Sequence, residues 1–421
     1  MTGKVITMLE TITTYIYTVY RLKSFSLAAQ ELYMSQPALS RAIKKAELEL
    51  GAPIFNRKTI PVSLTDEGKI YINTIEKMLQ LEEDAIENIR DRKRLRFHNV
   101  QEDPFSVYGV FFENEKYRRL PQKTAKDVSK GIYSLHANTS GGRVKFVTNS
   151  SVVAIKAVLS GIEKAPHFTL AGIAGFDMYI GKEAEYYATF IPPANISTGY
   201  ESIVHFDDSQ EREITINFPL YSDVTELYIG LEQNAVVKKA PGYTHSKPIV
   251  FYGSSITQGA CASRPGNAYE NIISRTLHTD YICLGFSGAT KAADEFAKYI
   301  KNLDMSVFVC DYDNNAPSLQ HLEETHKKMF LTVREANPDL PIILLSQPKY
   351  RLNKKEQQRL AVIRKTYEEA IAAGDKNVYF IDGPTLMQYA KNDGTVDGVH
   401  PNDLGFYSMA KVLIQRLESL L

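Results

Sequence analysis

The chain contains no tryptophan, and its 421 residues include only three cysteines, Cys261, Cys283 and Cys310. A sparse and odd cysteine count excludes a disulfide framework and is typical of a reducing compartment. No segment approaches the roughly 18 uninterrupted apolar residues of a membrane-spanning helix. The first twenty residues lack the apolar stretch and cleavage site of a signal peptide. These absences predict a cytoplasmic protein with no membrane partner.

Net charge is also absent, because 49 lysines and arginines balance 49 aspartates and glutamates. Whole-chain charge therefore indicates no class of partner, and any electrostatic signal has to be local. One local excess lies in residues 1–65, which hold eight basic and four acidic side chains. At roughly 100–200 residues per domain, the length predicts a multidomain protein.

Three parts of the chain differ in residue pattern. Residues 1–97 carry apolar residues at helical spacing, and residues 99–245 carry short alternating runs separated by turn-forming clusters. Residues 247–421 alternate apolar strands with helical stretches. These patterns predict an all-α segment, an antiparallel β-sandwich and a parallel sheet with helices on both faces. The expected domains are residues 1–66, 67–98, 99–245 and 246–421. The strands expected in the last part are Ile249–Tyr252, Tyr281–Leu284, Val307–Cys310, Ile342–Leu345 and Val378–Ile381.

Two helices separated by a turn are expected near the N-terminus. Ser35 can cap the second helix, and Pro37 fits its first turn. The polar side of this helix carries Gln36, Ser40, Arg41 and Lys44. Small polar side chains and an arginine at a helix start can reach base edges, while cations hold phosphates. The pattern indicates a DNA-binding segment; a helical oligomerisation module that binds no DNA is the alternative.

A long charged stretch follows, from about Thr65 to Phe97, with no glycine or proline after Gly68. Its apolar residues Ile75, Leu79, Ile86 and Ile89 lie three, four or seven positions apart, with Glu82 interrupting the series. The spacing predicts one long helix that packs against a second copy of the chain.

The run SFSLAAQELYMSQPALSRAIKKAELELGAPIFNRKTIPVSLTDEG closely resembles the DNA-binding domain of LysR-type transcriptional regulators, over roughly residues 8–95. The resemblance implies a winged helix-turn-helix, a linker helix that forms a homodimer or higher homo-oligomer, and a double-stranded DNA operator as partner. The expected DNA-contacting residues are Ser35, Gln36, Pro37, Ser40, Arg41, Lys44 and, in the wing, Arg57. Such regulators normally continue into a two-lobed effector domain, whose pattern is missing here.

In the last part, four short motifs lie at or just past the ends of expected strands, where ligands bind in open α/β folds. The first strand runs into GSSITQG, which places Ser255 at a strand-to-helix turn. GFSGAT offers the backbone N–H of Gly288, and DYDNNAP offers the side-chain amide of Asn315. DGVHPND places Asp397 and His400 three positions apart. Each motif alone has a simpler reading, such as a polar turn or a metal half-site; the four in order indicate one catalytic site.

These motifs resemble the four blocks of the SGNH or GDSL hydrolase superfamily, from about Lys247 to Leu421. The resemblance implies a flavodoxin-like α/β/α sandwich and ester hydrolysis that requires no metal and no cofactor. Ser255 would be the nucleophile, His400 its base, and Asp397 the group that holds the imidazole. The oxyanion would be met by the N–H groups of Ser255 and Gly288 and by the Asn315 amide.

The middle part resembles the β-domain of a bacterial subgroup of these esterases, which is marked by GxDLY. The matching segment here is GFDMY, residues 175–179. From its apolar surroundings, Asp177 is expected to orient a turn rather than to contact substrate. The subgroup often reads DYDHNAP where this chain has DYDNNAP, so Asn314 replaces a histidine and puts the substrate preference in doubt.

Two functions remain open at this point. In one, a LysR-like DNA-binding protein carries an active serine esterase in the effector position, acting on acetyl or other short acyl esters, with acetylated sugars as one class. In the other, the hydrolase fold senses a ligand without turnover, because folds are reused. The complete set of Ser255, Asp397, His400 and oxyanion donors favours retained chemistry.

Overall fold

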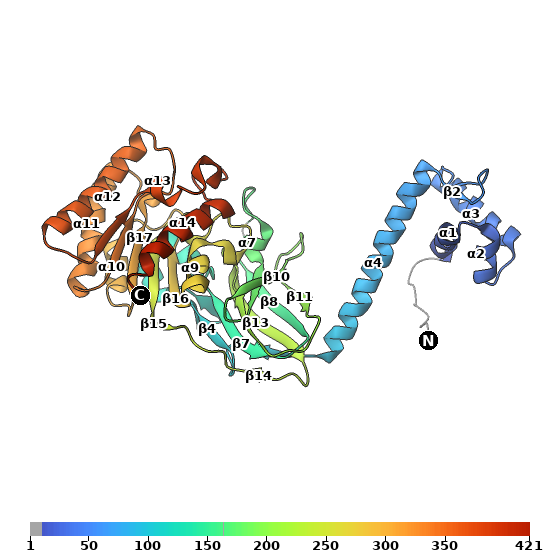
Figure 1. Cartoon of the computed structure of the whole chain (residues 1–421), viewed down its shortest axis with the longest axis horizontal. Coiled ribbons are helices and arrows are strands. Elements are labelled where there is room, and N and C mark those ends of the chain that lie inside the picture. The colour runs from blue at the N-terminus through green and yellow to red at the C-terminus, as the bar shows by residue number, and fades with distance from the viewer. Residues whose placement is uncertain (1–10, 163) are drawn as a thin grey trace. The chain divides into compact units, whose positions relative to one another are not determined.

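The computed structural model describes residues 11–162 and 164–421, and the chain divides into two compact units at Arg94 and Leu95. The first ten residues of the expected domain 1–66 lie outside the described residues. The expected fold classes are confirmed, in the expected order: a helical unit, a β-rich part and an α/β part (Figure 1). None of the described helices is both long and apolar enough to cross a bilayer.

The first unit is a helix-turn-helix with a small wing. Its elements are α1 (Thr11–Leu22), α2 (Phe25–Glu31), α3 (Gln36–Leu50), β1 (Phe55–Asn56), β2 (Ser63–Leu64) and α4 (Asp66–Arg94). Ser35 occupies the N-cap of α3 but makes no side-chain capping bond there. Gly51 ends the helix with φ +77°, a left-handed conformation that favours glycine. Apolar residues from these helices, among them Ile16 and Leu39, form one buried core.

The linker helix α4 is shorter than expected. It ends at Arg94, and Leu95–Asn99 forms strand β3, which pairs with β13 in the second unit. Leu95 is buried with Val152 and Ala154, and pairing with β13 gives this segment its strand conformation. The expected apolar series is also divided: Ile75 lies in the core of the first unit, whereas Ile89 is 57% exposed.

Two antiparallel sheets form the β-rich part. One has the order β11-β8-β13-β3, and the other has the order β10-β9-β12-β7-β14, with β4 also paired to β7. The strands are β4 (Ser106–Tyr108), β7 (Arg143–Thr148), β8 (Val152–Ser160), β9 (Phe176–Ile180), β10 (Glu185–Phe190), β11 (Gly199–His205), β12 (Arg212–Asn217), β13 (Asp223–Glu232) and β14 (Val237–Lys238). A hairpin of β5 (Phe111–Glu113) and β6 (Lys116–Arg118) and the helices α5 (Gln122–Val128), α6 (Lys130–Leu135) and α7 (Leu170–Ala174) complete this part.

The C-terminal part is a parallel sheet in the order β16-β15-β17-β18-β19. Its strands are β15 (His245–Gly253), β16 (Thr279–Gly285), β17 (Val307–Asp311), β18 (Ile342–Leu345) and β19 (Val378–Ile381). This is the flavodoxin-like order, in which the chain reverses direction across the sheet beside its first strand, and ligands bind at that switch point. The expected α/β/α sandwich is therefore confirmed, and the loop after β15 lies at its binding edge.

Helices cover both faces of this sheet (Figure 1). They are α8 (Ser255–Gln258), α9 (Tyr269–Leu277), α10 (Asp294–Ile300), α11 (Leu319–Ala336), α12 (Lys354–Ala372), α13 (Gly383–Leu386) and α14 (Asp403–Leu417), with short 3-10 turns at Pro265–Asn267, Asp313–Asn315 and Lys391–Gly394. Along β15, Ile249 and Phe251 pack into one core while Val250 and Tyr252 pack into the other. The first of these cores also contains the inner residues of the two antiparallel sheets, so the β-rich part and the parallel sheet share a core.

Candidate active site and DNA-binding surface

Ser255 stands where the first parallel strand meets a short helix. Strand β15 ends at Gly253, Ser254 accepts a hydrogen bond from the Ile256 N–H at 3.2 Å, and Ser255 is the first residue of α8. Glycine is required at 253, because a Cβ there would lie 2.0 Å from the Thr257 hydroxyl and 2.6 Å from the Asp311 carbonyl oxygen. The N–H of Ser255 has no preceding helical turn to bond to, so it remains available at the helix start.

The structure brings the three expected catalytic side chains into one hydrogen-bonded line. The Ser255 hydroxyl lies 3.0 Å from His400 Nε2, and His400 Nδ1 lies 2.8 Å from Asp397 Oδ2. The other oxygen of Asp397 accepts the backbone N–H groups of Val399 and His400 at 3.0 and 2.8 Å. Burial acts to raise the pKa of Asp397, but the backbone and ring N–H donors of His400 outweigh it and lower this pKa to about 2. Asp397 is therefore ionised at neutral pH.

The expected oxyanion donors differ in whether they already have a hydrogen-bond partner within the protein. Gly288 adopts φ +66° in the loop after β16, and its N–H has no hydrogen-bond partner among the described residues. The side-chain amide of Asn315 instead donates to the Phe286 carbonyl at 3.0 Å and to the Thr290 hydroxyl. Both amide hydrogens are thus already bonded within the protein, so Asn315 has to turn before it can meet an oxyanion.

In the first unit, the expected DNA-contacting residues fall into two groups. Gln36, Pro37, Arg41 and Lys44 are exposed on α3, and Ser35 is exposed at its cap. Ser40 and Arg57 contact each other instead: Arg57 donates to the Ser40 hydroxyl and to Glu47, each at 2.8 Å. Glu47 also accepts the N–H groups of Ile54 and Phe55, so it holds the wing against the helix.

Three family models match separate parts of the chain. Residues 13–69 match the lysR family of bacterial regulatory helix-turn-helix proteins, and residues 95–237 match the GxDLY N-terminus of SGNH-hydrolase-type esterases. Residues 246–418 match the GDSL-like lipase/acylhydrolase family. The chain joins a LysR-type helix-turn-helix to a GDSL-like esterase segment.

Individual proteins resemble one part or the other. The uncharacterized HTH-type transcriptional regulator YcgK of Bacillus subtilis is 30% identical over 134 residues, which are 31% of this chain and 41% of that regulator. The chain therefore spans less than half of that relative's length. A putative GDSL-like lipase from Bacteroides ovatus superposes with a TM-score of 0.70 at 29% identity, covering 77% of this chain and 98% of the lipase. The salicylyl-acyltransferase SsfX3 of a tetracycline biosynthetic pathway gives 0.65 at 20% identity, covering 78% and 98%, and shows the shared fold alone.

The GxDLY-type motif connects the β-rich part to the GDSL-like segment. Asp177 is completely buried and accepts hydrogen bonds from the Arg264 guanidinium at 2.7 Å, the Gly266 N–H at 2.8 Å and the Asn217 amide at 2.8 Å. Arg264 and Gly266 belong to the segment between α8 and α9. The expectation that Asp177 orients a turn is confirmed, and the turn is the one that follows α8.

Sequence reasoning did not find the residues that the β-rich part brings to the site. His167 and Phe168 precede α7, and their rings lie 5.7 and 6.3 Å from the His400 ring, centroid to centroid. Phe168 also contacts Tyr221, whose hydroxyl donates to the Ser255 carbonyl at 3.3 Å. No spacing in the sequence signals these contacts, because they depend on how the β-rich part packs on the parallel sheet.

Proposed function

We propose that this protein binds operator DNA through its LysR-type segment and hydrolyses short acyl esters at Ser255. The observation that carries the proposal is the line of two hydrogen bonds, 3.0 Å from Ser255 to His400 and 2.8 Å from His400 to Asp397. A serine hydroxyl becomes a nucleophile when a base within hydrogen-bond reach takes its proton, and that base has to be oriented by a third group. Both conditions are supported by the geometry.

In the proposed reaction, His400 accepts the Ser255 proton as the hydroxyl oxygen attacks the ester carbonyl carbon. The N–H groups of Ser255 and Gly288 meet the oxyanion of the tetrahedral intermediate. His400 then gives the proton to the leaving alcohol, and an acyl-serine remains. Water, deprotonated by His400, releases the acid and restores the hydroxyl. Ionised Asp397 keeps the proton on Nδ1 and stabilises the charged imidazole throughout.

The proposed substrate class is an acetyl or other short acyl ester, with acetylated sugars as the first class to test. A cleft of about 780 Å³ opens beside Gly288 and offers room for the alcohol or the acyl part. The start of α6, the loop that carries Gly288, and His321 and Thr325 of α11 line it. Lys130, Lys291 and Ser134 supply polar groups there, which suits a hydroxylated ligand.

One observation favours the alternative, a ligand sensor without turnover. The side-chain amide of Asn315 is hydrogen-bonded to Phe286 and Thr290. Of the three expected oxyanion donors, only the N–H groups of Ser255 and Gly288 are therefore available. Losing one such donor typically slows acyl transfer by about 10²–10³. A site with such slow acyl transfer keeps an ester bound for longer than one catalytic cycle of an efficient esterase. The bound ester itself would then be the signal.

The esterase reading is tested by the hydrolysis of 4-nitrophenyl acetate by the full-length protein. We expect Ser255→Ala to lower kcat at least about 10³-fold. Ser254→Ala is the matched control, because it removes a neighbouring hydroxyl whose role is to cap α8. We expect this variant to lose about 1 kcal/mol in stability and less than tenfold in kcat. Equal turnover by wild type and Ser255→Ala would refute the assignment.

For the first unit, we propose a homodimer that binds a two-fold symmetric operator. The exposed face of α3, with Arg41 and Lys44, supports the DNA contact, and the exposed apolar side chains of Ile70, Leu81 and Ile89 on α4 support self-association. Fluorescence anisotropy with the protein's own upstream DNA tests this at two salt concentrations, because phosphate contacts make binding salt-dependent. Binding without preference for that DNA over a scrambled duplex would contradict the regulator reading.

Ligand sensing and hydrolysis are separated by one comparison. Operator affinity is measured with and without acetylated sugars, for wild type and for Ser255→Ala. A sensor without turnover gives the same steady shift in both proteins. An esterase gives a shift that decays with time in wild type and persists in the variant.

A further inference from the structure

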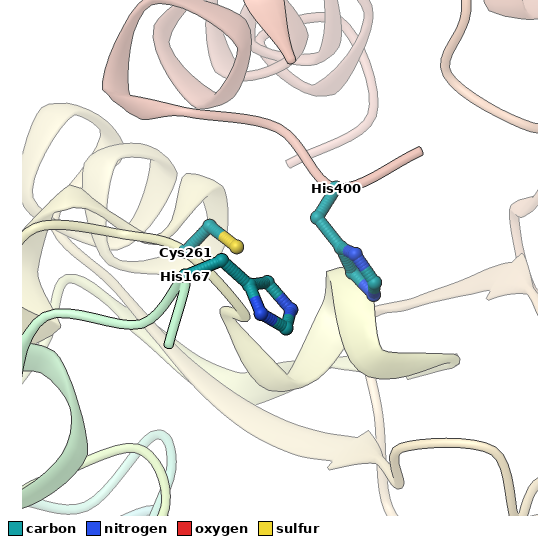
Figure 2. Close-up of side chains that lie close together, drawn as sticks. All are labelled: His167, Cys261 and His400. Carbon is teal, nitrogen blue, oxygen red and sulfur yellow. The ribbon is translucent and has the colours of Figure 1, made fainter. Parts of the chain in front are cut away.

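Three potential metal ligands, His167, Cys261 and His400, lie close together (Figure 2). His167 comes from the segment before α7 in the β-rich part, Cys261 follows α8, and His400 is the proposed general base. One nitrogen of each histidine and the sulfur of Cys261 all lie within 4.8 Å of one another. His167 is exposed, whereas Cys261 is buried and His400 is partly buried.

Two imidazoles and a thiol are a donor set that suits Zn²⁺. Zinc binds nitrogen at about 2.0–2.1 Å and sulfur at about 2.3 Å, so ligand atoms around a tetrahedral ion lie roughly 3.5 Å apart. Since the three donor atoms lie within 4.8 Å of one another, each pair needs to approach by no more than about 1.3 Å. Of the three side chains, the exposed His167 is the freest to move, because Cys261 is buried and His400 is hydrogen-bonded to Ser255 and Asp397.

The ring of His400 is already oriented for a metal. Its Nδ1 is bonded to Asp397, which leaves the lone pair of Nε2 as the one a metal can use, and a carboxylate behind a histidine ligand is a common arrangement at zinc sites. This Nε2 is the same atom that lies 3.0 Å from the Ser255 hydroxyl. A metal ion and the serine proton therefore compete for one lone pair.

We propose that His167, Cys261 and His400 bind one Zn²⁺ ion and that the bound ion switches off the hydrolase. Binding replaces the thiol proton, which is released to solvent, while the two imidazoles bind as neutral ligands and water fills the fourth position. His400 then has no lone pair for the Ser255 proton. The binding stands by itself, and the switching rests on the proposed esterase function.

Metal binding is measured on the full-length protein, with Zn²⁺ titrated against a chromogenic chelator and with Co²⁺ as a spectroscopic probe. We expect one equivalent of Zn²⁺ in wild type and a thiolate-to-cobalt charge-transfer band. Cys261→Ala and His167→Gln should each weaken binding at least about 100-fold and, for Cys261→Ala, remove the band. The matched controls Cys310→Ala and His245→Gln change the same residue types elsewhere in the fold, His245 at the start of β15, and should bind like wild type.

The switching is measured on 4-nitrophenyl acetate. Zinc should inhibit wild type and both controls, whereas Cys261→Ala and His167→Gln should stay active in zinc that inhibits wild type at least tenfold. Binding that is equally tight in wild type and Cys261→Ala overturns the site. Stoichiometric binding that leaves turnover unchanged overturns the switch. If no variant hydrolyses esters, the proposed esterase function fails, and the chelator and cobalt measurements still decide the site.

Discussion

Neutralising Asp177 is the most direct test of how the β-rich part is attached to the GDSL-like segment. In Asp177→Asn, the oxygen that accepts from Asn217 can remain, but an NH₂ group replaces the oxygen that faces Arg264 and the Gly266 N–H. The new NH₂ group then faces two other hydrogen-bond donors, in a site where the side chain at position 177 has no surface exposed to solvent. A buried donor without an acceptor pays the full cost of its lost hydration.

The expected loss follows from the burial of the pair. Removing one charge of a buried ion pair costs about 3–5 kcal/mol, because the other charge stays uncompensated. Arg264 keeps 19% of its side-chain surface exposed and lies 3.9 Å above the Tyr186 ring, which lessens its penalty. We therefore expect about 3 kcal/mol. With an unfolding entropy of about 2 cal/mol/K per residue for the unit that begins at Leu95, this corresponds to a decrease of ~4 °C in Tm.

Thermal and urea unfolding measure this loss, with esterase turnover recorded on the same samples. Glu185→Gln on the neighbouring strand is the control, because its exposed carboxylate should change stability by less than about 0.5 kcal/mol. The double variant of Asp177→Asn and Arg264→Met should lose less than the sum of the single losses. A loss below about 1 kcal/mol for Asp177→Asn, or simple additivity, would refute the reasoning.

Three further predictions concern other parts of the chain. Burial lowers the pKa of His326 from 6.5 to about 4, so between these pH values the unfolded chain takes up a proton that the folded chain does not. About 3 kcal/mol of stability should therefore be lost as the pH falls from 6.5 to 4. Urea titrations of His326→Gln should show a smaller loss over the same range. Arg119 is 2% exposed and donates to the Asn138 and Gly285 carbonyls, so Arg119→Met should cost at least about 2 kcal/mol in unfolding assays and lower kcat. Leu81→Glu, at a side chain 67% exposed on α4, should shift the protein to monomers in sedimentation equilibrium without changing the Tm of the GDSL-like segment.

The parallel sheet could be predicted almost residue by residue. The expected strands Ile342–Leu345 and Val378–Ile381 coincide with β18 and β19, and the other three lie within β15, β16 and β17. Strands covered on both faces carry unbroken apolar runs, and such runs have clear ends. The end of α4 was misjudged because Leu95–Asn99 continues a charged helical pattern. Its strand conformation comes from pairing with β13, which lies about 130 residues further along the chain.

The hydrogen-bonded set of Ser255, His400 and Asp397 could be predicted because each member is fixed by its local sequence. Ser255 follows a strand, and Asp397 and His400 share one short loop, so the fold has only to bring two segments together. Contacts that depend on tertiary packing were not predictable. No motif in the sequence marks Cys261, and its approach to His167 follows from the packing of the β-rich part on the turn that Asp177 holds.

Within the chain, the linker helix of the first unit is joined directly to a strand of the second unit's sheet. The linker helix ends at Arg94, and Leu95 begins a strand paired with β13, without an intervening loop. β13 contributes Leu227, Ile229 and Leu231 to the core that β15 also enters, just before Ser255. Ligand binding can change operator affinity through this core only if two states of the protein bind the ligand differently. The coupling is reciprocal, so if an ester raises operator affinity tenfold in Ser255→Ala, saturating operator must raise ester affinity tenfold in the same protein. Ester affinity that is unchanged by operator, alongside a changed operator affinity, would show that the ligand acts at a site other than Ser255.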